Sequence, residues 1–129
     1  MSEPALVGYQ YVTLRCVPRV ERDEFVNVGV VLYSQSAEFL DAATLLDEAK
    51  VLALAAGTDL DAVRAALETI RSVCRGATVA GLPGEAGLGR RFGWLAATRS
   101  TVIQPGPIHG GLTADPSAEL RRLLDCLVG

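Results

Sequence analysis

Two stretches of this 129-residue chain carry the side chains best suited to chemistry. The first is RVERDEFVN, residues 19–27, and the second is RSTVIQPGPIHGGLT, residues 99–113, which holds the single histidine. Arginine offers paired donors to planar anions, and histidine changes charge near neutral pH. We hypothesise that the two stretches meet in space and form a polar network or an anion site. Its candidate members are Arg19, Glu21, Asn27, Arg99, Ser100, Gln104 and His109.

Simpler interpretations of these residues stay open. Charges that alternate in sign, as between Arg19 and Glu24, are typical of a solvated loop with weak surface ion pairs. A single histidine in a loop rich in proline and glycine is often a hydrogen-bond anchor. We interpret Arg90 and Arg91 as surface charges and Trp94 as a core residue rather than a base-stacking one.

Familiar catalytic and cofactor motifs are absent from the sequence. It has no GxxxxGK[ST], GxSxG, HExxH or paired CxxC, and GEAGLG at 84–89 has the wrong glycine spacing for a dinucleotide site. Neither a metal nor a cofactor is therefore expected. The three cysteines, Cys16, Cys74 and Cys126, form no close pair, which is typical of a reducing compartment.

The composition favours a packed protein and opposes several partners. Half of the residues are apolar, and the net charge of −3 disfavours nucleic acid as a partner. No run approaches the roughly 18 apolar residues that a membrane span needs. The first residues, MSEPALVG, do not resemble a secretory signal, so we expect a cytoplasmic protein that does not enter membranes.

Three strands are predicted in the first third of the chain. Residues 9–17 alternate between apolar and polar side chains, and Pro18 ends that strand. In FVNVGVVLY the even positions from Val26 to Leu32 are predicted to form one apolar face, and Gly29 indicates a bulge or a close backbone approach. A third strand is expected over Phe39–Ala43.

Helices are predicted to follow, each with marked ends. Asp47 is a candidate N-cap for the first, and Thr58 for an amphipathic helix that ends before Gly76. Residues 81–89 are predicted to be a mobile loop, and RRFGWLAATRS a helical turn. TVIQPGPI is typical of an edge strand because of its two prolines. Asp115 and Pro116 predict the start of a final helix.

These elements predict a single α+β domain over residues 1–129. Its antiparallel sheet should have about four strands, covered on one face by about three helices, because the apolar helix faces and one sheet face must bury each other. The expected core includes Val28, Val30, Leu67, Ile70, Leu120 and Leu124.

Two segments resemble a bacterial family catalogued as domain of unknown function 3037. They are YVTLRCVPRVERDEFVNVGVVLY, residues 11–33, and RFGWLAATRSTVIQPGPIHGGLTADPSAELRRLLDCLV, residues 91–128. The chain differs from the family at Gly106 and Gly110, where the family has hydroxyl residues. The family's hallmark positions fall on Arg15, Pro18, Arg19, Glu21, Glu24, Phe25, Asn27, Gly29, Arg99, Ser100, Gln104, His109 and Leu112.

The resemblance implies a partner and supplies no catalytic assignment. Family members look like frequent genomic neighbours of HipA-like serine/threonine kinases, so a HipA-like kinase is the implied partner. The expected function is a noncatalytic binding or accessory protein acting with that kinase. The alternative is a small enzyme or anion-binding domain that uses Arg19, Arg99 and His109. Whether the protein is an enzyme stays open at this point.

Overall fold

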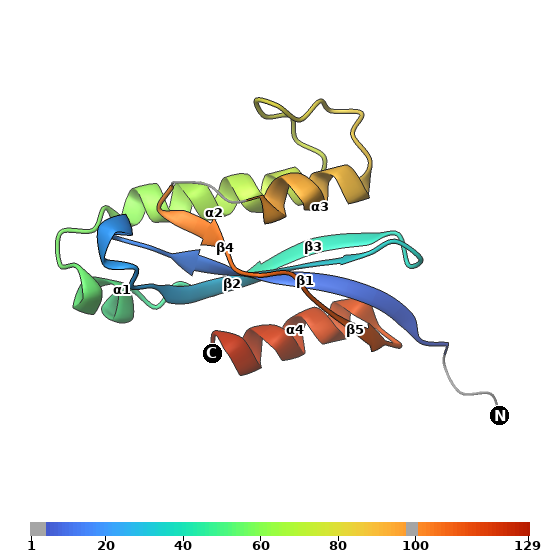
Figure 1. The fold of residues 1–129 in the computed structure, drawn as a ribbon, viewed down its shortest axis with the longest axis horizontal. Coiled ribbons are helices and arrows are strands. Elements are labelled where there is room, and N and C mark those ends of the chain that lie inside the picture. The colour runs from blue at the N-terminus through green and yellow to red at the C-terminus, as the bar shows by residue number, and fades with distance from the viewer. Residues whose placement is uncertain (1–4, 98–100) are drawn as a thin grey trace.

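The computed structural model describes residues 5–97 and 101–129 of the chain. Its elements follow one another along the chain as strands, then helices, then two short strands and a last helix (Figure 1). They are β1 (Val7–Cys16), the 3-10 turn η1 (Val20–Arg22), β2 (Val26–Ser34), β3 (Phe39–Thr44), α1 (Glu48–Leu54), α2 (Leu60–Cys74), α3 (Leu88–Ala96), β4 (Ile103–Pro105), β5 (His109–Thr113) and α4 (Pro116–Leu127).

The strands form one antiparallel sheet, and the α+β class predicted from the sequence is confirmed. Among the described residues the sheet has five strands in the order β3-β2-β1-β4, with β5 also paired to β1. Of the predicted strand TVIQPGPI, residues 101–108, only β4 is a strand, and it pairs with residues 14–16 of β1; β5, which pairs with residues 7–11, follows the predicted strand and was not predicted. Pro105 ends β4 and Pro107 lies in the break between β4 and β5. Both are at the sheet edge, where the N–H that proline lacks is needed for at most one strand pairing.

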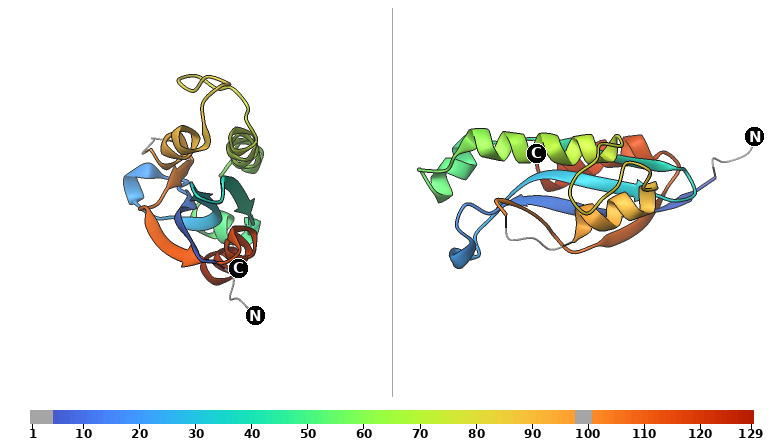
Figure 2. Two further views of the ribbon diagram at one scale, coloured as in Figure 1. Left: turned by 90° about the vertical axis from the view of Figure 1, so that its right-hand side faces the viewer. Right: turned by 90° about the horizontal axis from the view of Figure 1, so that it is seen from above.

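Helices cover both faces of this sheet, rather than the one face predicted. Helices α2 and α3 lie side by side on one face, and α4 lies on the other (Figures 1 and 2). The reason is that β2 is apolar on both sides, so each side needs its own cover. Val12, Leu14 and Val31 pack toward α2 and α3, whereas Val30 and Leu32 pack with Leu120 and Leu123 of α4.

A bulge in β2 explains why the predicted even-numbered apolar face is wrong. Leu14 pairs with Gly29, but the next residue, Arg15, pairs with Asn27, so β2 has one extra residue there. Val28 therefore joins the core under α2 and α3, while Val30 faces α4. The close approach expected at Gly29 is confirmed, because a Cβ there would lie 2.9 Å from the carbonyl oxygen of Ala43.

Capping side chains begin three of the helices. Asp47 and Asp115 accept hydrogen bonds from the backbone N–H groups of Lys50 and Ala118, as predicted. The N-cap of α2 is Asp59, one residue beyond the predicted Thr58. Leu124, expected in the core, is only partly buried, whereas the other five predicted core residues are buried. In the described part of the chain, no helix has the length and hydropathy of a membrane span.

Arg91 is buried between α2, α3 and the loop that joins them, so its interpretation as a surface charge is wrong. Only 2% of Arg91 is exposed. Its guanidinium donates hydrogen bonds to the carbonyl oxygens of residues 73, 76, 77, 83, 84 and 86. Several of these carbonyls belong to the end of α2 and the residues just after it, where the helix dipole favours a cation. Arg90 is exposed, as predicted.

We predict that Arg91→Met lowers the free energy of unfolding by about 3 kcal/mol or more, because it strands several buried carbonyls without donors. Arg90→Met, on the adjacent exposed residue, should change it by less than about 0.5 kcal/mol. Chemical denaturation of the two variants measures this difference. Equal effects would contradict a structural role for Arg91.

Candidate functional site

The structure describes five of the seven predicted site residues. Arg99 and Ser100 lie outside the described residues. Arg19 and Glu21 are exposed on the polar connection between β1 and β2, which contains the short turn η1. The remaining three, Asn27, Gln104 and His109, lie on strands of the sheet.

Asn27 and Gln104 lie on opposite sides of Arg15, each directly paired with it. In the sheet, Arg15 of β1 pairs with Asn27 of β2 on one side and with Gln104 of β4 on the other. Directly paired residues point to the same face, so the three form one polar row across the sheet. The two stretches therefore do approach each other, and the residue between them is one that the site prediction omitted. Alternation along β1 places Arg15 on the face of Tyr11 and Thr13, and that pattern is visible in the sequence.

Close packing holds Arg15 in place. Its guanidinium carbon lies 4.2 Å from the centre of the Phe25 ring, within the range of a cation–π contact. On the other side, Gly106 passes so near that a Cβ there would lie 3.2 Å from the Arg15 side chain and 2.6 Å from the Thr13 hydroxyl. Gly106 also donates a backbone hydrogen bond of 2.8 Å to the carbonyl of Thr13.

Two buried polar atoms of this row have no hydrogen-bond partner among the residues that the structure describes. They are Nε of Arg15 and Oδ1 of Asn27, a donor and an acceptor on directly paired residues. The amide nitrogen of Asn27 is used, because Nδ2 donates to the carbonyl oxygen of Leu127 at the end of α4 over 3.2 Å. The row therefore retains unused hydrogen-bonding capacity next to the end of α4.

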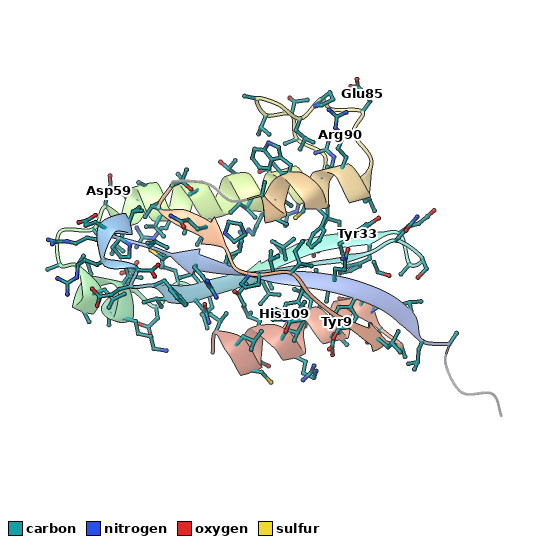
Figure 3. All side chains as sticks on the ribbon, in the orientation of Figure 1. Tyr9, Tyr33, Asp59, Glu85, Arg90 and His109 are labelled. Atoms are coloured by element: carbon teal, nitrogen blue, oxygen red, sulfur yellow. The ribbon has the colours of Figure 1, made fainter. Side chains whose placement is uncertain are left out.

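His109 lies farther along the same face, on an aromatic stack. Its ring is stacked on Tyr11, with 5.3 Å between centroids, and Tyr11 lies 6.2 Å from Tyr9. His109 and Tyr9 are both on the side of the sheet where α4 lies (Figure 3). His109 itself is exposed. Arg15, Thr13 and Tyr11 alternate along β1, so the polar row and the aromatic stack belong to one surface.

Tyr9 joins this surface to α4. Its hydroxyl donates a 2.5 Å hydrogen bond to Oε2 of Glu119, and Arg122 donates two bonds of 2.7 Å to the same carboxylate. The hydrogen bonds from Arg122, aided by Tyr9 against the opposing effect of burial, hold the pKa of Glu119 at about 2, below its ordinary value of 4.5. Burial raises the pKa of Tyr9, and the neighbouring Glu119 carboxylate raises it further.

We call the surface formed by Tyr11, Thr13, Arg15, Gln104 and His109 the open face. It lies on the α4 side of the sheet, where α4 packs mainly over β2 and β3 and reaches β1 at Tyr9 and Tyr11, so that Thr13, Arg15, Gln104 and His109 lie beside the helix rather than beneath it. Aromatic rings, an arginine and an amide beside exposed Phe25 are the residue types that dominate binding surfaces. Its chemistry suits recognition of a partner or an anion.

A separate hollow of about 330 Å³ lies elsewhere, beside α1 and α2. Its lining includes Thr44, Arg64 and Arg71. Arg64 is paired with Glu48 and Asp61, and Arg71 with Glu68 and Thr44, so most of its charges are already matched. None of the predicted site residues lines it. Within residues 5–97 and 101–129, no three histidine, cysteine or acidic side chains gather as metal ligands.

The fold and this surface define an α+β protein whose sheet is open on half of one face. The chain matches a family model described as "Protein of unknown function (DUF3037)" over residues 11–128, and it therefore belongs to that family. The resemblance noted from the sequence is confirmed. The searches of curated proteins and of solved structures found no match to this chain.

The bonds between Tyr9, Glu119 and Arg122 predict a pH dependence of stability. Because the folded-state pKa of Glu119 lies below its ordinary value, its contribution is complete above about pH 4.5 and is lost as the pH falls toward 2. Glu119→Gln should cost about 1 to 2 kcal/mol at neutral pH and should flatten the loss of stability in acid.

Glu68→Gln is the matched control, since Glu68 also pairs with an arginine three residues later on a helix but is 57% exposed. It should change stability by a few tenths of a kcal/mol at most. Urea denaturation at a series of pH values measures both variants. A wild-type acid profile that Glu119→Gln leaves unchanged would show that this carboxylate does not tie α4 to the sheet.

Proposed function

We propose that this protein is a noncatalytic binding or accessory protein of the cytoplasm that acts with a HipA-like serine/threonine kinase. The single observation that carries a binding role is the open face, where His109 is exposed and Tyr11 and Arg15 are only partly buried beside α4. Hot spots of protein interfaces are enriched in tyrosine and arginine, and neighbouring half-buried residues exclude water around them. The kinase as partner rests on the family resemblance.

The architecture supports recognition by a preformed surface. The open face is built on strands, and Tyr9, Gly106 and Phe25 fix the side chains of β1 from several directions. A rigid surface loses little conformational entropy when a partner binds. The net charge of −3 supports a protein partner over nucleic acid.

An anion-binding domain is the second candidate. The observation that favours it is Nε of Arg15, a charged donor with no hydrogen-bond partner among the described residues. A small carboxylate ligand would accept a hydrogen bond from Arg15, and His109 could contribute a second donor from farther along the face. In this form of the proposal, Arg15 replaces Arg19, which lies on the η1 connection.

The kinase partnership is tested by co-expression with a HipA-like kinase encoded beside this gene, where the source genome has one. We expect the two proteins to co-purify and to elute together in size-exclusion chromatography. His109→Ala should weaken the complex by about tenfold, as expected for a contact worth about 1.4 kcal/mol. Separate elution at micromolar concentration, with the kinase both free of nucleotide and bound to ATP, would contradict the partnership.

Arg90→Ala serves as the matched control, because Arg90 is exposed on α3, on the other side of the sheet from His109 (Figure 3). It should leave the complex intact. Loss of binding in Arg90→Ala with full binding in His109→Ala would place the partner on the α3 side. Titration of the protein with acetate, followed by NMR shifts of Arg15 and Asn27, tests the anion candidate separately.

A further inference from the structure

Strand β5 leaves one sheet edge unpaired and unprotected. It is the outer strand beside the N-terminal half of β1, and within the described residues it pairs only with β1. Natural proteins protect such edges with charges, prolines or bulges. The neighbouring strand β4 has that protection in its last residue, Pro105, but HGGLT, residues 109–113, contains no proline, acid, lysine or arginine.

The direction of the backbone groups on β5 follows from the alternation along β1. The backbone groups of Thr13 and Val17 point toward the β4 side of β1. The carbonyl oxygen of Thr13 accepts a hydrogen bond from the N–H of Gly106, and the N–H of Val17 donates one to the carbonyl oxygen of Val102. Because the direction alternates along a strand, the backbone N–H and C=O groups of Tyr9 and Tyr11 point to the same side, toward β5, where these residues pair with Gly111 and His109. The N–H and C=O groups of Gly110 and Leu112 therefore point outward from the sheet.

Leu112 is the most exposed large apolar side chain among the described residues, at 68%. Leu112 pairs with Gly8 of β1, and Gly8 has no side chain that could cover the leucine. Gly110 is also exposed, and a Cβ there would come within 4 Å only of the carbonyl oxygen of Tyr9. The strand thus carries an exposed leucine at position 112 and, two residues before it, an exposed glycine at position 110, which leaves room for an apolar side chain.

We propose that β5 pairs antiparallel with β5 of a second copy of this chain, about a two-fold axis at Gly111. In that register Gly110 faces Leu112 of the second copy and Leu112 faces its Gly110, so each leucine covers a glycine. The outward backbone groups of these residues satisfy one another, because opposite residues of an antiparallel pair exchange both hydrogen bonds. His109 faces Thr113 of the second copy, which brings no like charges together.

A second copy fits this edge because the strand is complementary to itself, as an isologous interface requires. The pairing joins two sheets into one and sets the Tyr11–His109 stacks of both copies beside the axis, on one continuous open face. A single five-residue strand buries less than the roughly 1,200–2,000 Å² of a standard interface, so the dimer is weak and depends on concentration. The inference uses the sheet edge alone and does not depend on the kinase partnership.

Light scattering after size-exclusion chromatography over a wide range of concentrations tests the dimer. The wild-type mass should rise from one chain to two. Leu112→Lys places a charge on the edge, and Gly110→Pro removes an outward N–H while leaving the pairing with β1 intact. Each should weaken dimerisation by about tenfold or more. Circular dichroism verifies that each variant folds. If one of the two variants does not fold, the other alone tests the dimer.

Leu45→Lys is the matched control, because Leu45 is 47% exposed and follows β3, at the opposite edge of the sheet. It should dimerise as the wild type does. Hydrogen exchange should also show the Gly110 amide protected at high concentration in the wild type and open in Leu112→Lys. A wild-type mass of one chain at the highest concentration would overturn the proposal. It would do so even if this edge pairs with a strand of another protein, because the proposed occupant is a second copy of this chain. Equal weakening in Leu45→Lys and Leu112→Lys would also overturn it.

Discussion

The burial of β2 on both of its faces is the constraint from which the rest of the layout follows. Val28 and Val31 of this strand pack toward α2 and α3, Val30 and Leu32 pack toward α4, and exposing either set to water would be unfavourable. Two helices cover one side, but α4 alone covers the other and sits over β2 and β3. The open face exists because one helix is too narrow to cover five strands, and what remains beside it is the polar and aromatic half of β1.

Arg91 solves a second problem, which is how a loop rich in glycine and proline keeps α2 and α3 in one layer. That loop buries Leu82 in the core, but its glycines and prolines offer little further apolar packing to hold its shape. The guanidinium instead collects carbonyl oxygens from both ends of the loop and from the end of α2. A planar group with five N–H donors suits this role in a way that a lysine ammonium does not. Helices α2 and α3 therefore pack as one unit on the side of the sheet opposite the open face.

Local patterns in the sequence predicted most elements, whereas packing between distant elements did not follow from them. Alternation located β1, and aspartates located the starts of α1 and α4, because both signals act within a few residues. The face chosen by α4 depends on which side of β2 is uncovered, which no local pattern records. Arg91 could have been found: Leu88, Arg91 and Leu95 share one side of α3, so the arginine falls within the apolar stripe. Thr58 was predicted in place of Asp59 because both residues are good N-caps.

The candidate site was predicted in part for a related reason. Asn27 and Gln104 were selected by residue type, and Arg15, which lies between them, was omitted although alternation placed it on the same face. The bulge at Val28 decides this arrangement. In a regular strand Asn27 would share the face of Gly29 and point into the apolar core beneath α2. The extra residue turns Asn27 to the other side, where it pairs with Arg15 and bonds to the end of α4. Gly29, which alone fits against Ala43 and Leu14 at that point, is therefore a requirement of the open face as well as of the core.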